Sequence, residues 1–127
     1  MATIRRFEDL GCWQKARKLA NAIYDLTEQQ RFAKDYKLRD QIQGAAGSVM
    51  HNIAEGFDSG FNPEFIRFLK LSRRSASEVQ SELYLALDRK YITQEQLDAA
   101  YQLATEAKQL INAFIAYLRK HKPPPTA

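Results

Sequence analysis

The stretch Asn52-Ile53-Ala54-Glu55-Gly56-Phe57-Asp58-Ser59-Gly60 (NIAEGFDSG) closes one long helical pattern, and a second long pattern opens just after it. Gly56 is expected to end the first helix in a left-handed conformation, because glycine adopts positive φ without steric cost. The loop 57–61 then turns the chain towards Asn62. A connection this short favours antiparallel neighbours, so the stretch predicts a helical bundle.

The composition agrees with an all-α fold of one domain. The chain has 127 residues, which suits a single core, and only four prolines and five glycines interrupt long runs of good helix formers. We expect one domain over residues 1–122 and a disordered, proline-rich tail over 123–127. No run approaches the ~20 apolar residues of a membrane span, and no apolar signal core follows Met1, which predicts a cytoplasmic protein without membrane contact.

Apolar residues recur with helical spacing in four segments, which predicts an antiparallel up-down-up-down four-helix bundle. Asn62 followed by Pro63 is typical of a helix start. Thr93 and Gln96 fit a capping box at the start of the last helix. The four predicted helices cover about Glu8–Gln30, Lys34–Glu55, Asn62–Lys90 and Thr93–Lys120.

Two of these helices carry a second apolar stripe beside the first, with members seven residues apart. Such stripes indicate either a wide core arc or a surface for self-association, and we expect a homo-oligomer. The interface residues predicted in this way are Cys12, Leu19 and Leu26 on the first helix and Leu103, Leu110 and Tyr117 on the last.

Catalytic signatures are weak in this sequence. His51 and Glu55 share a helix face, yet two potential ligands do not make a metal site, and no second ligand pair of the di-iron type occurs. Cys12 lies on an apolar stripe, as a small buried hydrophobe would. Neither a glycine-rich phosphate loop nor a nucleophile elbow is present. We therefore expect no catalytic residues, no metal, no cofactor and no enzymatic activity.

Basic residues are concentrated, although the net charge is only +4. Arg67, Lys70 and Arg74 follow i, i+3, i+7 spacing opposite the apolar seam of the third helix, so they form one exposed stripe. Such a stripe neutralises phosphates without reading bases, although a charge run can also be just a solvated face. The predicted nucleic-acid-binding residues are Arg67, Lys70, Arg73, Arg74, Lys15 and Lys18.

Three blocks of the sequence resemble one bacterial family. They are Phe7-Glu8-Asp9-Leu10 with Trp13-Gln14-Lys15-Ala16, the NIAEG block 52–56, and Phe65 followed by Arg67-Phe68-Leu69. Together they resemble the four-helix bundle family encoded by intervening sequences in 23S ribosomal RNA genes. That resemblance implies a fold and a genomic location but no established biochemical activity.

The same family is similar to the accessory variability protein of diversity-generating retroelements. This similarity implies a homopentameric ring and partners that include nucleic acid and a reverse transcriptase. The chain departs from the family pattern at Gln43-Gly44, where basic residues are common, and at Arg74, where glycine is common.

The sequence therefore predicts a non-catalytic homo-oligomer that binds RNA or DNA, and the resemblance implies that it is a pentamer. The alternative is a protein-interaction scaffold that binds another protein and no nucleic acid. Within the NIAEG block, Glu55 would lie at the negative end of its helix, which is unfavourable unless a partner compensates. We expect a structural motif in which Asn52 and Glu55, beside Gly56, form a polar network with Ser75 or nearby arginines.

Overall fold

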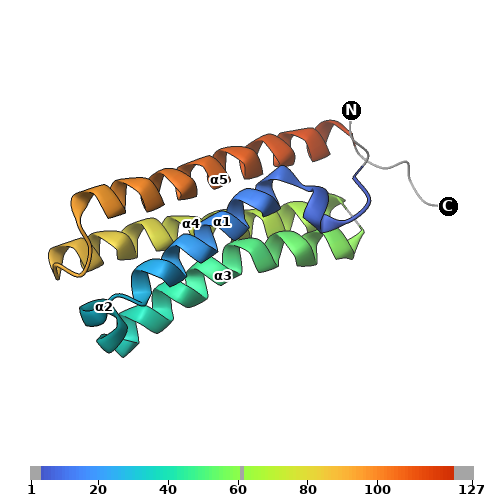
Figure 1. The fold of residues 1–127 in the computed structure, drawn as a ribbon. Helices are drawn as coiled ribbons and strands as arrows, with labels where there is room; N and C mark the ends of the chain where they lie inside the picture. Colours follow the sequence, from blue (N-terminus) through green and yellow to red (C-terminus); the bar gives the residue numbers. More distant parts are fainter. Residues whose placement is uncertain (1–3, 61, 122–127) are drawn as a thin grey trace.

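Helices account for most of residues 4–60 and 62–121, which are the parts of the chain that this computed structural model describes (Figure 1). No strand occurs within those ranges, so the all-α prediction is confirmed. The predicted tail 123–127 lies outside the described residues. The elements are a 3-10 turn η1 (Phe7–Asp9) and the helices α1 (Gly11–Thr27), α2 (Gln30–Lys34), α3 (Tyr36–Ser59), α4 (Asn62–Asp88) and α5 (Gln94–Lys120).

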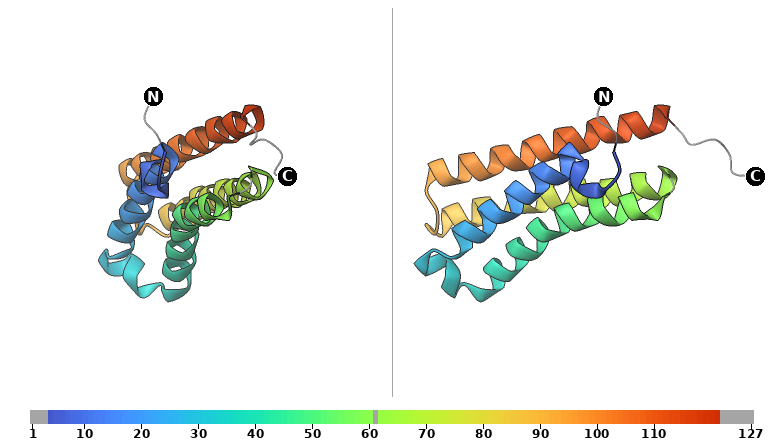
Figure 2. Two further views of the ribbon diagram at one scale, coloured as in Figure 1. Left: turned by 90° about the vertical axis from the view of Figure 1, so that its right-hand side faces the viewer. Right: turned by 45° about the vertical axis from the view of Figure 1, so that its right-hand side comes forward.

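The four long helices alternate in direction along the chain (Figures 1 and 2). Helix α1 packs against α3 and α5, and α4 packs against the same two helices. Consequently α1 and α4 occupy diagonal corners of the bundle, and their outer faces point to different sides. None of the helices in the described ranges is both long enough and apolar enough to cross a lipid bilayer.

Every long helix contributes fully buried side chains to one core. Leu19, Ile42, Leu69 and Ile111 come from α1, α3, α4 and α5 and have no exposed surface. Each full burial of such a side chain stabilises the fold by about 1.5–3 kcal/mol. Thr27, Ser72 and Gln80 are the buried polar residues in the described ranges, and the hydroxyl of Ser72 donates to the carbonyl oxygen of Val49 at 2.6 Å. The bundle is therefore held by apolar packing, with α3 and α4 joined by a buried hydrogen bond.

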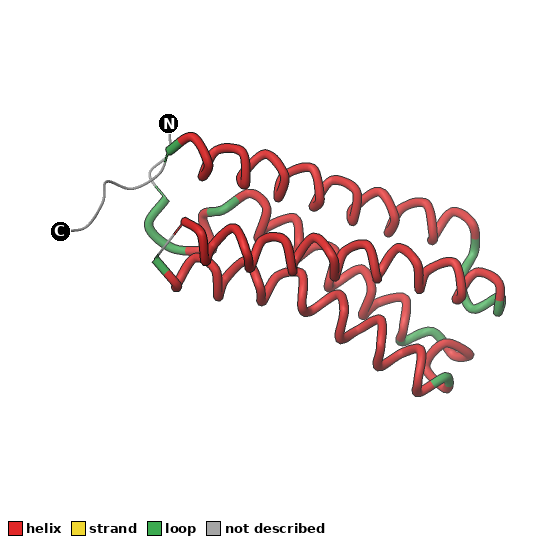
Figure 3. The backbone as a smooth tube through the Cα atoms, turned by 180° about the vertical axis from the view of Figure 1, so that it is seen from behind, coloured by secondary structure: helices red, strands yellow, loops and turns green. Residues whose placement is uncertain are grey.

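The connection between α1 and α3 contains a helix that the sequence analysis did not predict (Figure 3). Helix α1 ends at Thr27, and the five residues of α2 place the ring of Phe32 in the core. Helix α3 starts at Tyr36 because the carboxylate of Asp35 accepts from the amide of Leu38 at 3.1 Å. The hydroxyl of Tyr91 donates to the same carboxylate at 2.9 Å. Both hydrogen bonds lower the pKa of Asp35, that of Leu38 more than that of Tyr91.

The prediction that Gly56 ends its helix is wrong. Helix α3 continues to Ser59, and Gly60 is the residue with left-handed backbone, at φ 75°. Gly56 is buried inside the helix, where Phe65 and Phe68 of α4 pack directly against it. The missing side chain leaves room for the ring of Phe65 and the Cβ atom of Phe68.

The side chain of Asn62 connects the start of α4 to the end of α5. Helix α4 begins at Asn62 itself, and the side-chain amide donates to the carbonyl oxygens of Leu118 at 2.9 Å and His121 at 3.1 Å. Those carbonyl groups lie in the last turn and at the end of α5, where the helix provides no further N–H groups to bond to them. Asn62 therefore ties the start of α4 to the end of α5.

Replacing Gly56 with alanine is expected to lower the free energy of unfolding by about 1 to 2 kcal/mol. A Cβ atom there would lie 2.7 Å from Cδ1 of Phe65 and 2.9 Å from Cβ of Phe68. Because the Cβ of Phe68 moves only with α4, overpacking outweighs the gain in helix propensity. Gly44→Ala is the matched control: its new Cβ meets nothing within 4 Å, so a gain of about 0.5 to 1 kcal/mol is expected. Urea unfolding of both variants measures this, and equal stabilisation by the two would contradict the packing assigned to Gly56.

Candidate nucleic-acid interface

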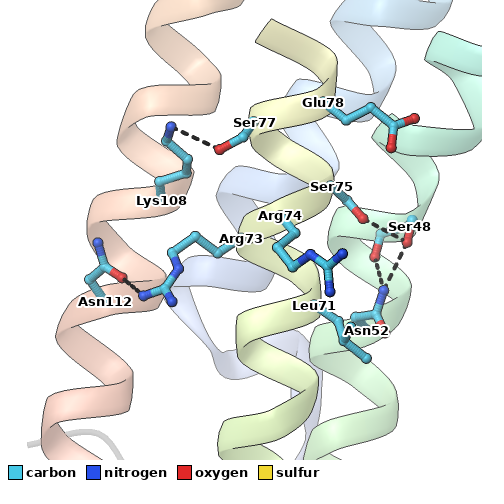
Figure 4. Close-up of a pocket in the computed structure, with 10 residues that line it drawn as sticks. All are labelled: Ser48, Asn52, Leu71, Arg73, Arg74, Ser75, Ser77, Glu78, Lys108 and Asn112. Atoms are coloured by element: carbon cyan, nitrogen blue, oxygen red, sulfur yellow. Dashed lines mark hydrogen bonds between the residues drawn. The ribbon is translucent and has the colours of Figure 1, made fainter. Parts of the chain in front are cut away.

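Polar side chains from three helices meet on the outer surface of α4 (Figure 4). They line a shallow hollow of about 950 Å³ in the middle of the helix. We use the name α4 cationic face for the basic residues Arg67, Lys70, Arg73 and Arg74 of α4 together with Lys108 of α5. The lining residues are Ser48 and Asn52 of α3, Leu71, Arg73, Arg74, Ser75, Ser77 and Glu78 of α4, and Lys108 and Asn112 of α5.

On the side towards α5, neutral groups hold two cations in place. The guanidinium of Arg73 donates to Oδ1 of Asn112 at 2.6 Å. The ammonium of Lys108 donates to Oε1 of Gln80 at 2.7 Å and to the hydroxyl of Ser77 at 3.2 Å. Neither cation has a carboxylate within 4 Å in the described part of the chain. Their charges are therefore positioned but not neutralised.

On the side towards α3, Arg74 points past Ser75 towards Asn52 (Figure 4). The amide of Asn52 donates to the carbonyl oxygen and to the hydroxyl of Ser48, both at 2.8 Å. The hydroxyls of Ser48 and Ser75 lie 3.0 Å apart and share a hydrogen bond. These contacts join α3 to α4. Arg74 itself forms no hydrogen bond or ion pair with any described residue.

The other two cations of the face lie nearer the start of α4. Arg67 forms two hydrogen bonds with Oε1 of Glu64, at 2.6 and 3.1 Å, and these lower the pKa of Glu64. Its guanidinium also lies 4.6 Å from the ring centre of Phe68. Lys70 is exposed and makes no polar contact with the residues that the structure describes. Arg67 is therefore partly neutralised, whereas Lys70 is open to a ligand.

The two predicted binding residues on α1 do not join this face. Lys15 forms an ion pair with Glu106 of α5 at 3.1 Å, and the hydrogen bond in this pair lowers the pKa of Glu106. Lys18 is exposed and lines a separate hollow with Trp13 and Arg17. Since α1 and α4 are diagonal, the structure places the predicted residues on two surfaces.

Sequence reasoning missed Lys108 and Asn112 as members of the site. Their spacing of four residues on one helix, in a segment with bases and no acids, is the signal that could have found them. The spacing alone could not show which helix lies beside these two residues. Only the packed bundle shows that this side of α5 borders Arg73 of α4.

The polar motif around the NIAEG block is only partly as expected. Asn52 and Ser75 are linked through Ser48, but Glu55 is exposed and bonds to none of the described residues. The reason is the length of α3. The helix runs to Ser59, so Glu55 lies a full turn before the end, where the dipole that would disfavour its charge has faded.

The second apolar stripe is exposed on one helix only. Cys12, Leu19 and Leu26 are buried, because α1 packs against two neighbouring helices, so the expectation of a free stripe there is wrong. Burial also raises the pKa of the Cys12 thiol to about 11, which keeps it protonated and unreactive. On α5, by contrast, Leu110 is 39% exposed and Tyr117 is 42% exposed, while Leu103 is partly buried.

Leu110 and Tyr117 border an apolar groove of about 780 Å³ at the end of the bundle. The rings of Phe57, Phe65 and Phe114 contribute to its wall. No cluster of three or more potential metal-ligating side chains occurs in residues 4–60 and 62–121.

An acidic pair on α4 begins at the hollow, because Glu78 lines it and Glu82 follows one helical turn later. The pKa of Glu82 is raised from an ordinary value of 4.5 to about 7 by two causes, its own burial and the neighbouring Glu78. Burial is the larger cause, followed by the hydrogen bond that a protonated Glu82 shares with Glu78. Glu82 is therefore about half protonated near neutral pH, which reduces negative charge beside the α4 cationic face.

The Glu82→Gln variant is expected to lose a pH dependence of stability that the native chain has. The folded state holds the Glu82 proton more tightly than the unfolded state, so this group makes the fold less stable as pH rises from about 4.5 to about 7. Melting temperatures of both proteins across this window measure the effect. The difference should favour Gln increasingly towards the upper end, and parallel curves would contradict the raised pKa.

Comparisons with known proteins agree with this architecture. A family model described as 23S rRNA-intervening sequence protein matches residues 8–113. The chain is also similar to the crystal structure of a protein of unknown function from the S23 ribosomal protein family of Bacteroides thetaiotaomicron VPI-5482. The two share 26% identity and a TM-score of 0.76, over 82% of this chain and 97% of that chain. A comparison with curated proteins found no match. The chain therefore belongs to the 23S rRNA-intervening sequence protein family.

Proposed function

We propose that the chain is a non-catalytic helical bundle that binds RNA or DNA through phosphate contacts on the α4 cationic face. The observation that carries this proposal is that Arg73, Arg74 and Lys108 meet around one hollow with no carboxylate within 4 Å of any of them in the described ranges. Three close cations without counter-charges repel one another, so an anionic partner that covers them all is stabilised.

The shape of the face favours phosphate contacts over reading of bases. The cations project from the outer surface of a bundle, and the hollow beside them is shallow and open. Specific reading requires side chains that enter a groove and reach base edges. Binding through phosphates alone depends strongly on salt and little on sequence.

We also propose that the chain forms a homo-oligomer, with five subunits as the family resemblance implies. The exposed Leu110 and Tyr117 and the apolar groove beside them support self-association, because large apolar patches on soluble proteins mark contact surfaces. A ring would present the α4 cationic face once per subunit. Several weak phosphate contacts would then act together on one nucleic acid.

The apolar groove also favours a second function, a scaffold that binds another protein and no nucleic acid. A groove lined by Phe57, Phe65 and Phe114 suits an apolar segment of a partner. In that case the cationic face is only a solvated surface, and the nucleic-acid titration below separates the two functions.

A filter-binding titration with a structured RNA and a DNA duplex tests the main proposal. We expect binding at low salt, with a slope of log K against log salt of about −2 to −4 for the few phosphates that this face can contact. Little difference is expected between unrelated sequences. Absence of binding even at low salt would reject the nucleic-acid function in favour of the scaffold.

A further inference from the structure

Two adjacent arginines of the α4 cationic face differ in what holds them. Arg73 and Arg74 leave α4 towards opposite neighbours, Arg73 towards α5 and Arg74 towards α3 (Figure 4). The guanidinium of Arg73 is held by Asn112 at 2.6 Å. None of the five N–H donors of Arg74 has an acceptor among the described residues. Arg74 is therefore the cation with the most bonding capacity left for a ligand.

A free hydroxyl donor lies beside Arg74. The amide of Asn52 donates to both oxygens of Ser48, and this orientation is fixed because the carbonyl oxygen of Ser48 can only accept. The hydroxyls of Ser48 and Ser75 share one hydrogen bond at 3.0 Å. Each hydroxyl has a single hydrogen, so whichever serine donates, the other keeps one O–H without an acceptor in the described residues.

These donors point to an acceptor with several negative oxygens. Glu78 lines the same hollow, but it lies more than 4 Å from the guanidinium of Arg74 and forms no ion pair with it. A phosphodiester presents two charged oxygens that match the planar fork of an arginine, with room for a hydroxyl donor on one of them.

We propose that Arg74 and the Ser48–Ser75 hydroxyl pair form a discrete site for one backbone phosphate of the bound nucleic acid. This inference rests on the proposed function and locates its strongest contact on the α3 side of α4. Arg73 and Lys108 contribute a general positive field and not the main direct contact, because they already donate hydrogen bonds to Asn112, Gln80 and Ser77.

Neighbouring charge-neutralising variants test the site, with a labelled single-stranded RNA and a labelled DNA duplex as probes. Arg74→Gln is expected to weaken binding about tenfold and to reduce the salt slope by about 1. Arg73→Gln removes the same charge one residue away and is expected to weaken binding less than about threefold. Arg74→Lys keeps the charge but not the fork, so the salt slope should stay while affinity falls.

The serines give an independent readout. The Ser48→Ala/Ser75→Ala variant is expected to weaken binding about threefold with an unchanged salt slope, because a hydroxyl releases no counterion. Ser81→Ala, at an exposed position on α4, serves as its control, and thermal melts confirm that all variants are folded.

Equal losses for Arg73→Gln and Arg74→Gln would overturn this site and leave the proposed function standing. Wild-type affinity of the double serine variant would also overturn it. If the native chain binds neither probe at low salt, the proposed function fails and the site fails with it.

Discussion

Phe32→Ala is expected to lower the free energy of unfolding by about 3 to 5 kcal/mol, a large share of the 5 to 15 kcal/mol typical of a domain. The ring has no exposed surface and lies in tilted contact with Tyr91, at 5.4 Å between ring centres. Truncation to a methyl group removes the transfer free energy of the ring and leaves a cavity beside Tyr91.

The effect extends beyond the cavity because Phe32 anchors α2. A helix of five residues is not stable by itself and depends on the packing of its apolar side chain. When that anchor is lost, the capping of α3 by Asp35 and the hydrogen bond from Tyr91 to Asp35 lose their support.

Two controls make the Phe32 prediction specific. Phe32→Leu keeps most of the apolar volume and is expected to cost less than about 1.5 kcal/mol. Tyr24→Ala removes an aromatic ring that is 45% exposed and is expected to stay within about 0.5 kcal/mol of the native chain. Denaturant unfolding measures the stability of all three variants. A Phe32→Ala variant as stable as Phe32→Leu would show that Phe32 does not anchor α2 in the connection between α1 and α3.

The long helices were predictable because each carries a regular apolar seam and some have clear start signals. Thr93 and Gln96 form the expected capping box, with Thr93 Oγ1 accepting from Gln96 N at 3.2 Å and Gln96 Oε1 from Thr93 N at 2.9 Å. Such local signals are reliable because their partners lie within four residues. The same holds for the cationic stripe of Arg67, Lys70 and Arg74, which helical spacing alone brings to one face.

The errors arose where two readings of one residue type compete. Gly56 and Gly60 both suit a left-handed helix end, and only the packing of Phe65 and Phe68 shows that Gly56 is needed for a close helix contact instead. Glu55 was misjudged for the same reason, since its position relative to the helix end depends on which glycine ends α3.

Tertiary neighbours decided the remaining differences. The stripe of Cys12, Leu19 and Leu26 resembles an interface in isolation, but α1 lies between α3 and α5 and buries it. Lys108 joined the candidate site because α5 borders α4, and Lys15 left it because Glu106 pairs with it on another side of the bundle. Sequence spacing within one helix cannot show which face of a second helix lies beside it.

Reversing three charges of the α4 cationic face is expected to reduce nucleic-acid affinity more than about a hundredfold. The variant Arg67→Glu/Lys70→Glu/Arg74→Glu removes three phosphate contacts and adds three charges that repel phosphates. All three side chains are exposed, so the fold should tolerate the change. Loss of the Arg67 guanidinium also removes its hydrogen bonds to Glu64, so the carboxylate of Glu64 adds a further charge that repels phosphates.

A matched variant separates local contacts from net charge. Arg31→Glu/Lys34→Glu/Lys37→Glu changes the total charge by the same amount at three exposed positions on α2 and the start of α3. Because these residues lie outside the α4 cationic face, only a general electrostatic loss of less than about tenfold is expected.

Binding by the α4 cationic face is tested most directly by a side-by-side titration of the native chain and these two triple variants with one structured RNA at low salt. If the α4 cationic face binds nucleic acid, we expect tight binding by the native chain, a loss of more than about a hundredfold for the α4 variant, and a small loss for the α2–α3 variant. Equal affinities for the two variants, or no binding by the native chain, would contradict binding by this face.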